Sequence, residues 1–412
     1  MKQVILGLFL LGVWNGYGQE QNPFFTRSSD STVKQETGVF ADYYVGSNAI
    51  TNSFVNRFFM GGFIDDKLKK QVEGRLQKMN YLGGDINEGL WYSHRIDSGM
   101  SKGKFSWFIS VRSRQHADFA YSKDLFKVCF EGNDAYKGQT ADFNGFQLNT
   151  IQYQQFQAGI AGPHFGIALS VYNGSQYQQL HAPTAQLFTS QAGDYLDFTT
   201  RYSMTVSDPK STSPFANNGL GAGLDFYYHA PLYIETKRKG EVFLECSDIG
   251  FITWNRKTNH YAGDTMYHFD GFAINNAFQL ADTSVHYSAK TILNAHVQSQ
   301  SYYTSFLPGN MNISYVPDGK IWQFVPGIRL RYAANYKPFE YLQLRYHIRS
   351  KITLNIELGY GGYAGLQSAL SVQAKLFKGL HLKAGTYNFA GYIIPAFTCG
   401  QGAYVSIVKL FH

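Results

Sequence analysis

The chain has 412 residues, a formal net charge of +7, and more aromatic residues (17%) than charged ones (16%). No run of about 18 apolar residues follows the N-terminal segment, which excludes membrane-spanning helices. A modest positive charge in so aromatic a chain gives no indication of nucleic-acid binding, and no Pro/Gly/Ser-rich linker divides the chain into separate domains.

The first 18 residues have the features of a cleavable export signal. Lys2 supplies the positive start, and an apolar core follows from Val4 to Val13. We expect residues 1–18 to be removed, so that the mature protein begins at Gln19. The first cysteine is Cys129, which excludes a lipid anchor at the new N-terminus.

An amphipathic helix is predicted in the N-terminal segment 19–83. Asp65 can cap a helix from Asp66 to Met79, in which Leu68 and Val72 belong to an apolar stripe and the other faces are basic. We expect this helix to be a plug or to lie on the periplasmic rim of the following domain. Docking of a protein partner and binding to a membrane surface are the alternatives. A second short helix is predicted from Lys123 to Phe130.

From residue 84 to 412 the sequence predicts an all-β domain, a transmembrane antiparallel β-barrel. Apolar residues alternate with polar ones in segments about as long as one bilayer crossing, separated by turn residues. The clearest lipid-side positions are Ile328, Leu330, Tyr332 and Ala334; Leu342, Leu344, Tyr346 and Ile348; Ile352, Leu354, Ile356 and Leu358; and Leu370, Val372, Ala374 and Leu376. Weaker alternation over 105–112, 196–204 and 220–226 raises the count to about 14 strands, with bounds of about 12 to 16.

The end of the chain suggests how the barrel is oriented. The last strand, Gln401 to Phe411, ends in an aromatic residue, as the terminal strands of outer-membrane barrels do. With a periplasmic C-terminus, 349–351 and 377–379 become periplasmic turns, and 359–365 and 388–400 become external loops. The segment 270–300 has no clean period and predicts a long loop with a short helix.

Catalytic signatures are absent from the sequence. It contains no Gly-x-Ser-x-Gly elbow, His-Glu-x-x-His pair, Cys-x-x-Cys pair or Walker loop, so we expect neither an enzyme nor a cofactor. His260, Asp264, His268 and Asp270 could ligate a metal, but polar loop residues are the favoured interpretation. The three cysteines, Cys129, Cys246 and Cys399, have no framework spacing; unpaired thiols are favoured over one disulfide and a spare.

The most suggestive polar residues lie on the predicted lumen side of consecutive C-terminal strands, with His381 nearby. They are Arg329, Arg331, Arg345, His347, Arg349, Glu357, Lys375 and Lys383. Because they fall on neighbouring strands, we expect them to form one basic wall. The wall either pairs with carboxylates such as Glu357 and Asp225 to hold the barrel together, or binds the acidic group of a ligand.

Several segments resemble a known family. Phe54 to Leu76, Phe130 to Phe143, Ser247 to Asn255 and the Gly-rich C-terminal hairpins are similar to an uncharacterised family of Bacteroidota outer-membrane proteins, distantly similar to the FadL and PorV group. The resemblance implies a barrel in the outer membrane of a Gram-negative bacterium. Its setting includes fatty-acid-type transporters, the type IX secretion protein PorV and accessory barrels of insertion machinery.

Two functions therefore remain open. A FadL-like barrel would pass or bind amphipathic or hydrophobic small molecules, such as an amphipathic acid, and would contain a continuous cavity. A non-transporting scaffold, or an accessory barrel of a secretion or assembly complex, would have a filled lumen. Its loops and the Asp66 to Met79 helix would then bind protein partners.

Overall fold

The computed structural model describes residues 23–25, 32–96, 105–235, 237–270, 297–319, 321–348, 351–377 and 379–412. The expected signal, Arg349 and most of the predicted loop 270–300 lie outside these residues. The strands are β1 (Gln35–Ser47), β2 (Met79–Arg95), β3 (Ser106–Ser122), β4 (Gln139–Asp142), β5 (Phe146–Ala161), β6 (Phe165–Thr189), β7 (Leu196–Val206), β8 (Gly219–Ile234), β9 (Lys237–Trp254), β10 (Asn259–Phe269), β11 (Val297–Gln300), β12 (Tyr303–Phe306), β13 (Asn310–Pro317), β14 (Trp322–Arg331), β15 (Lys337–Ile348), β16 (Ile352–Gly362), β17 (Gly365–Lys375), β18 (Leu380–Thr386) and β19 (Gly400–Phe411). The helices are η1 (Pro23–Phe25), α2 (Asn52–Met60), α3 (Asp66–Glu73), α4 (Lys123–Glu131), η2 (Asp134–Tyr136) and α7 (Ala390–Ile393).

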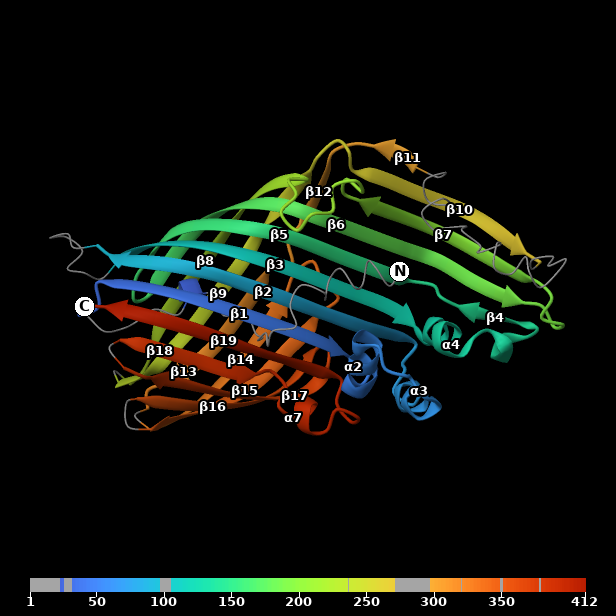
Figure 1. The fold of residues 1–412 in the computed structure, drawn as a ribbon. Helices are drawn as coiled ribbons and strands as arrows, with labels where there is room; N and C mark the ends of the chain where they lie inside the picture. Colours follow the sequence, from blue (N-terminus) through green and yellow to red (C-terminus); the bar gives the residue numbers. More distant parts are fainter. Residues whose placement is uncertain are drawn as a thin grey trace.

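Fourteen of the strands form a closed antiparallel barrel (Figure 1). The ring runs β1-β2-β3-β5-β6-β8-β9-β13-β14-β15-β16-β17-β18-β19 and closes where β19 pairs with β1, from Gln35 opposite Phe411 to Gly46 opposite Gly400. The expected fold class is confirmed, and the expected last strand is β19. Among the described residues, no helix is long and apolar enough to cross a bilayer.

The barrel begins earlier than residue 84, where the sequence analysis placed its start. Strand β1 and the first residues of β2 are part of the ring. The alternation in β1 is hidden because Phe40 faces inward, where it packs with Trp91 and Phe24. An apolar patch inside the barrel therefore removes the contrast between the two faces of this strand.

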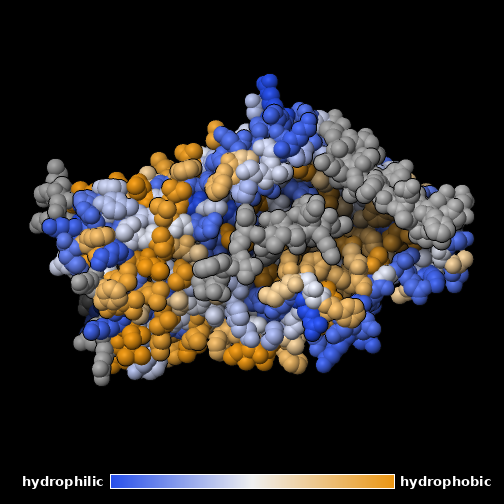
Figure 2. All heavy atoms as spheres, viewed as in Figure 1, coloured by the Kyte–Doolittle hydropathy of each residue, from blue (hydrophilic) through white to orange (hydrophobic). Residues whose placement is uncertain are grey.

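The outer face of the ring is apolar. In β16, Ile356 and Leu358 are more than half exposed, whereas their neighbours Asn355 and Glu357 are buried on the inner face. Figure 2 shows the resulting hydrophobic band around the part of the barrel nearest the C-terminus. The burial pattern of β16 agrees with the expected faces, and in β15 and β17 the exposed Leu342, Leu370 and Val372 alternate with chamber-lining residues such as Gln343 and Ser371. Strand β14 ends at Arg331, however, and does not include Tyr332 and Ala334, which were expected on its lipid side.

A sheet extends the wall beyond the barrel at the end opposite the C-terminus (Figure 1). Strand β6 pairs with β8 up to Gly174, and its second half, from Gln178, pairs with β7. Strand β10 pairs with β7, and β4 pairs with the end of β6. With 25 residues, β6 is far longer than the roughly 9 to 11 residues that cross a bilayer. The predicted strand at 196–204 is therefore present, but it lies outside the ring.

Helices α2, α3 and α4 pack on the outside of the wall at this same end. Their core contains Val45, Tyr121 and Leu82, which alternate with inward-facing residues of β1, β3 and β2. The cap predicted at Asp65 is confirmed, since its side chain accepts the N–H of Leu68. The helix stops at Glu73, before Gly74, because the chain must already enter β2 at Met79.

These positions correct the expected site of the predicted helix. It does not plug the lumen, because it packs against outward-facing side chains. It also cannot lie on a periplasmic rim if the C-terminus is periplasmic. Arg75, just after α3, donates to the carbonyl of Phe397 at 3.1 Å, in the loop that precedes β19. That loop and the C-terminus lie at opposite ends of β19. The helix expected at Lys123 to Phe130 is α4.

Replacing Ile356 by Arg should reduce the free energy of unfolding by about 2 to 4 kcal/mol, because the charge would face hydrocarbon near the middle of the band. Gln373→Arg, on the inner face of β17, is the matched control and should be tolerated. Urea unfolding in lipid vesicles measures both. Equal losses would show that the two faces are assigned incorrectly, since a one-residue slip exchanges them.

Glu73 of α3 and Lys127 of α4 form an ion pair that joins the two helices. The hydrogen bond from Lys127 lowers the pKa of Glu73, and the same bond raises the pKa of Lys127. The pair therefore stabilises the helix contact at neutral pH. This contribution is lost as the pH falls through the lowered pKa of Glu73, and also as it rises through the raised pKa of Lys127.

Because both side chains are partly exposed, Glu73→Gln should weaken the α3 to α4 contact by only about 0.2 to 1 kcal/mol. Hydrogen exchange of α3 and α4 amides, compared at neutral and acidic pH, measures the change. When the pH is lowered, the protection of these amides should decrease more in the wild type than in Glu73→Gln. Asp134→Asn removes a separate exposed ion pair with Lys137 and serves as the control. An identical pH response in all three proteins would refute the role of the pair.

Candidate functional site in the barrel lumen

A row of charged residues on β3 points into the lumen. Arg112, Arg114, His116 and Asp118 occupy every second position of the strand, and each is at most 3% exposed. Asp118 accepts from His116 at 3.1 Å. In the alternating geometry of a strand these four side chains share one face, so they form a continuous ionic row along the inner wall.

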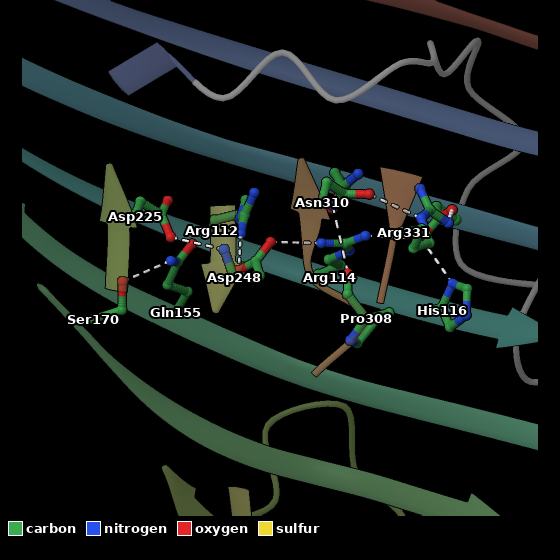
Figure 3. Close-up of polar contacts among 12 residues, drawn as sticks. Arg112, Arg114, His116, Gln155, Ser170, Asp225, Asp248, Pro308, Asn310 and Arg331 are labelled. Carbon is green, nitrogen blue, oxygen red and sulfur yellow. Dashed lines mark hydrogen bonds and ion pairs between the residues drawn. The ribbon is translucent and has the colours of Figure 1, made fainter. Parts of the chain in front are cut away.

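Asp248 of β9 receives both arginines of this row (Figure 3). Arg114 donates to its second carboxylate oxygen at 2.5 Å, and the backbone N–H of Asp248 donates to Asp225 at 2.8 Å. Asp248 lies in a β-bulge between β8 and β9 and has a φ of 55°. A bulge redirects a side chain, and aspartate is among the residues that tolerate positive φ. The bulge thus turns this carboxylate toward Arg112 and Arg114.

Asp85 of β2 connects this row to the opposite wall. It accepts from Arg114 at 3.2 Å and from His116 at 2.9 Å, and its second oxygen receives Arg331 of β14. Strands β2 and β14 are seven places apart in a ring of fourteen, so they stand opposite each other. The Arg331 to Asp85 ion pair therefore crosses the whole lumen. Asn310 holds the Arg331 side chain in place with a bond of 2.9 Å.

The turn between β14 and β15 closes the lumen further. Asn335 donates to Asp118 at 2.6 Å, and the Lys337 ammonium lies 5.5 Å from the ring centre of Tyr81. Residues 332–336 consequently lean across the barrel toward β2 and β3. These contacts explain why β14 is shorter than its sequence pattern predicted.

A chamber of about 440 Å³ lies between the Arg331 to Asp85 ion pair and the end of the barrel where β15 turns into β16. Its lining reaches from Asp85 and Arg331 to His347 and Thr353, which flank the 349–351 turn. The lining is mixed in charge and includes Glu245, Arg329, Arg345, Glu357, Lys383 and Tyr404. The chamber could therefore hold a small polar or amphipathic molecule.

The residues of the expected basic wall lie together only in part, and two of its arginines are paired with carboxylates. Arg329 forms a two-bond ion pair with Glu357, at 2.8 and 2.7 Å, and Arg331 is paired with Asp85. Arg345 and Lys383 line the chamber, where Arg345 donates to Gln343 at 2.6 Å.

The other expected residues have peripheral positions. His347 lies at the edge of the chamber, bonded to Thr353 at 3.0 Å and Gln323 at 3.2 Å. Lys375 is exposed at the turn end of β17 and is not among the residues that line the chamber. Arg349 lies outside the described residues.

The N-terminal residues Pro23–Phe25 also lie in the lumen. The ring of Phe24 is completely buried and packs on Phe108 and Tyr227, with centroid distances of 5.5 and 5.3 Å. Phe25 borders the chamber. The cluster around Phe24 includes inward-facing residues of β1, β2 and β3, namely Phe40, Trp91 and Phe108, and therefore occupies part of the lumen.

The alternative metal site is not assembled. His260, Asp264 and His268 lie on one face of β10, but the two histidines are eight residues apart in an extended strand, which corresponds to about 26 Å. His268 instead pairs with Asp197 at 2.5 Å, and His260 bonds Thr205 at 3.2 Å. No group of potential metal ligands occurs among the described residues. All three cysteines are free thiols.

Sequence reasoning missed most of the ionic row. The signal was present, because charged residues occupy alternate positions from Arg112 to Asp118. Asp85 and Asp248 had no comparable signal. Asp85 stands alone among small and polar residues, and the orientation of Asp248 depends on a bulge that alternation does not reveal.

Comparison with known proteins adds a family. No curated protein sequence matches the chain. Among solved structures, the Ralstonia pickettii toluene transporter TbuX has 7% identity and a TM-score of 0.39, covering 92% of this chain and 90% of its own. A Pseudomonas aeruginosa FadL homologue has 8% identity, a TM-score of 0.39, and coverages of 92% and 91%. The translocator domain of the autotransporter NalP from Neisseria meningitidis has 8% identity, a TM-score of 0.32, and coverages of 95% and 91%. Residues 42–318, more than half of the chain, match the Family of unknown function (DUF5723), and the chain belongs to that family.

Proposed function

We propose that the protein is a closed barrel of the bacterial outer membrane that serves as a scaffold or accessory barrel and does not form an open pore. The apolar outer band and the closed ladder support the location, since a ring without edges satisfies every backbone group in hydrocarbon. The observation that carries the functional proposal is the Arg331 to Asp85 ion pair, which crosses the lumen.

The crossing is part of a larger lock. Arg112 and Arg114 bind Asp248 from one side of the ring, and Arg331 reaches Asp85 from the other. Breaking one partner of a buried ion pair leaves an uncompensated charge, which typically costs about 3 to 5 kcal/mol. The lock therefore supports a role in which the barrel acts as a rigid support.

The scaffold's working surface would be the end that carries the helices and the extended sheet. Three helices and strands β4, β7 and β10 lie there, whereas at the other end the β5 to β6 and β15 to β16 connections are turns of a few residues. Binding sites concentrate in such elaborated loops on a rigid support. We propose that protein partners bind this surface.

The wild-type barrel should show no steady conductance in planar bilayers, because ion pairs cross its lumen. Replacing Arg331 and Asn335 together by Ala removes their bonds to Asp85 and Asp118 across the lumen and should produce conducting events. Arg345→Ala, which enlarges the chamber but leaves the crossing intact, is the control. Steady pore conductance of the wild type would contradict the proposal.

A second candidate function is the binding of an amphipathic acid in the chamber. Arg345 favours this function, because its guanidinium donates a hydrogen bond to the neutral side chain of Gln343. The nearby carboxylates bond other groups: Glu245 accepts from Asn312, and Glu357 accepts from Arg329. A ligand carboxylate at Arg345 would form a charge-assisted bond in the chamber. Passage of the ligand would then require the crossing to open.

Arg345→Ala should lower the amount of acidic lipid that co-purifies with the barrel by several-fold, because it removes a chamber-lining cation whose hydrogen bond goes to a neutral side chain. Mass spectrometry of extracted lipids measures this amount. Lys375→Ala removes a cation that does not line the chamber and should leave the lipid content unchanged. Equal lipid content in wild type and both variants would exclude the acid-binding function.

A further inference from the structure

We propose that the segment around α7, residues 389–397, inserts into the interfacial layer of the bilayer and anchors the loop end of the barrel to lipid. The inference rests on the proposed membrane location. It assigns a lipid-binding role to a loop that barrel closure does not require.

The segment presents large apolar side chains to the surroundings. Ile393 is 61% and Phe397 68% exposed, and Phe389, Tyr392 and Ile394 are each more than 40% exposed. The loop from 388 to 400 contains no charged residue. Contiguous apolar surface of this kind marks a binding or membrane face.

The exposed face continues the apolar band of the barrel wall. The hydroxyl of Tyr392 bonds that of Tyr43, which points outward from β1, at 2.7 Å. The N–H of Phe389 donates to the carbonyl of Ser368, at the loop end of β17. Next to it, Leu366 is 66% exposed on the outer face of the same strand. Lipid that covers Leu366 therefore meets the α7 segment at the edge of the band, where aromatic residues favour the interface.

The backbone of the segment is suited to a poorly hydrated layer. The N–H groups of Tyr392, Ile394 and Phe397 donate to carbonyls within the segment. Asn52 of α2, itself 1% exposed, donates from its side-chain amide to Gly391 at 3.2 Å and to Gly400 at 2.8 Å. These bonds hold the loop against the wall, so its apolar side chains stay exposed and do not fold back on the barrel.

The position of the loop favours lipid over a protein partner. Over β2 and β3, polar outward residues such as Glu88, Ser113 and Gln115 separate the helices from the apolar band. On the β17 side, Ser368 is the single uncharged polar position between Leu370 and Leu366 on the outer face. The α7 segment therefore lies closer to the apolar band than the part of the helical surface that covers β2 and β3.

Fluorescence quenching by brominated phospholipids tests this proposal. Phe397→Trp is introduced into a background variant in which the two exposed tryptophans, Trp107 and Trp322, are replaced by Phe. The remaining barrel tryptophans, Trp91 and Trp254, are buried inside. The protein is refolded into vesicles of phosphatidylcholine brominated either near the headgroup end or near the methyl end of the acyl chain. Ile393→Trp is a second reporter in case the first variant does not fold, which is checked by whether boiling changes its mobility on a gel.

Two matched variants separate the possible outcomes. Ile356→Trp reports on the lipid-facing wall, and Met266→Trp reports on β10 of the extended sheet, where the side chain is 63% exposed. We expect quenching at position 397 to be comparable to that at position 356. Quenching at 397 should be stronger when the bromine is near the headgroup, and the tryptophan at 266 should not be quenched. Quenching at 356 without quenching at 397 or 393 would overturn the anchor and leave the membrane barrel intact. Absence of quenching at all positions would overturn the membrane location itself.

Discussion

The pairing of β1 with β19 is the constraint on which the rest of the structure depends. Twelve consecutive residue pairs join the two strands and leave the ring without an edge. Only then can an apolar outer face meet hydrocarbon with all its backbone groups bonded. Closure also fixes which strands face each other across the lumen. It places β2 across from β14, and therefore brings Asp85 within reach of Arg331, a residue 246 positions away in sequence.

Closure at fourteen strands leaves a lumen that side chains can bridge. Charges inside such a narrow space lose most of their hydration, and they are tolerated only when they are paired and hydrogen-bonded. The interior follows this rule closely. Asp85 and Asp248 each serve two arginines, and Glu357 is bonded to Arg329 through both oxygens. A network of this kind gives the two walls a single relative position.

The sequence predicts the features that depend on local alternation and fails where distant residues decide. Ile356 and Leu358 alternate with Asn355 and Glu357, so β16 could be read directly, and Asp65 identified the start of α3. Strand β1 could not be predicted, because its inward-facing Phe40 packs in an apolar cluster with Phe24, which precedes the strand in the sequence. The partners of Arg331 could not be predicted either, since its pattern fixes the face it occupies and not the strand it meets.

The same distinction explains why the arginines divide into different roles. By alternation Arg329, Arg331 and Arg345 are equivalent lumen residues, yet the structure gives the first two carboxylate partners and leaves Arg345 facing the chamber beside Gln343. A bonded pair such as Arg329 with Glu357 stabilises the wall and has little remaining capacity for a ligand. If the chamber binds an anion, Arg345 is therefore the side chain to which it would bind, while Arg331 decides whether that anion could travel further. If both proposals hold, the lumen would separate a locking role, on β14, from a binding role, on the adjacent strand β15.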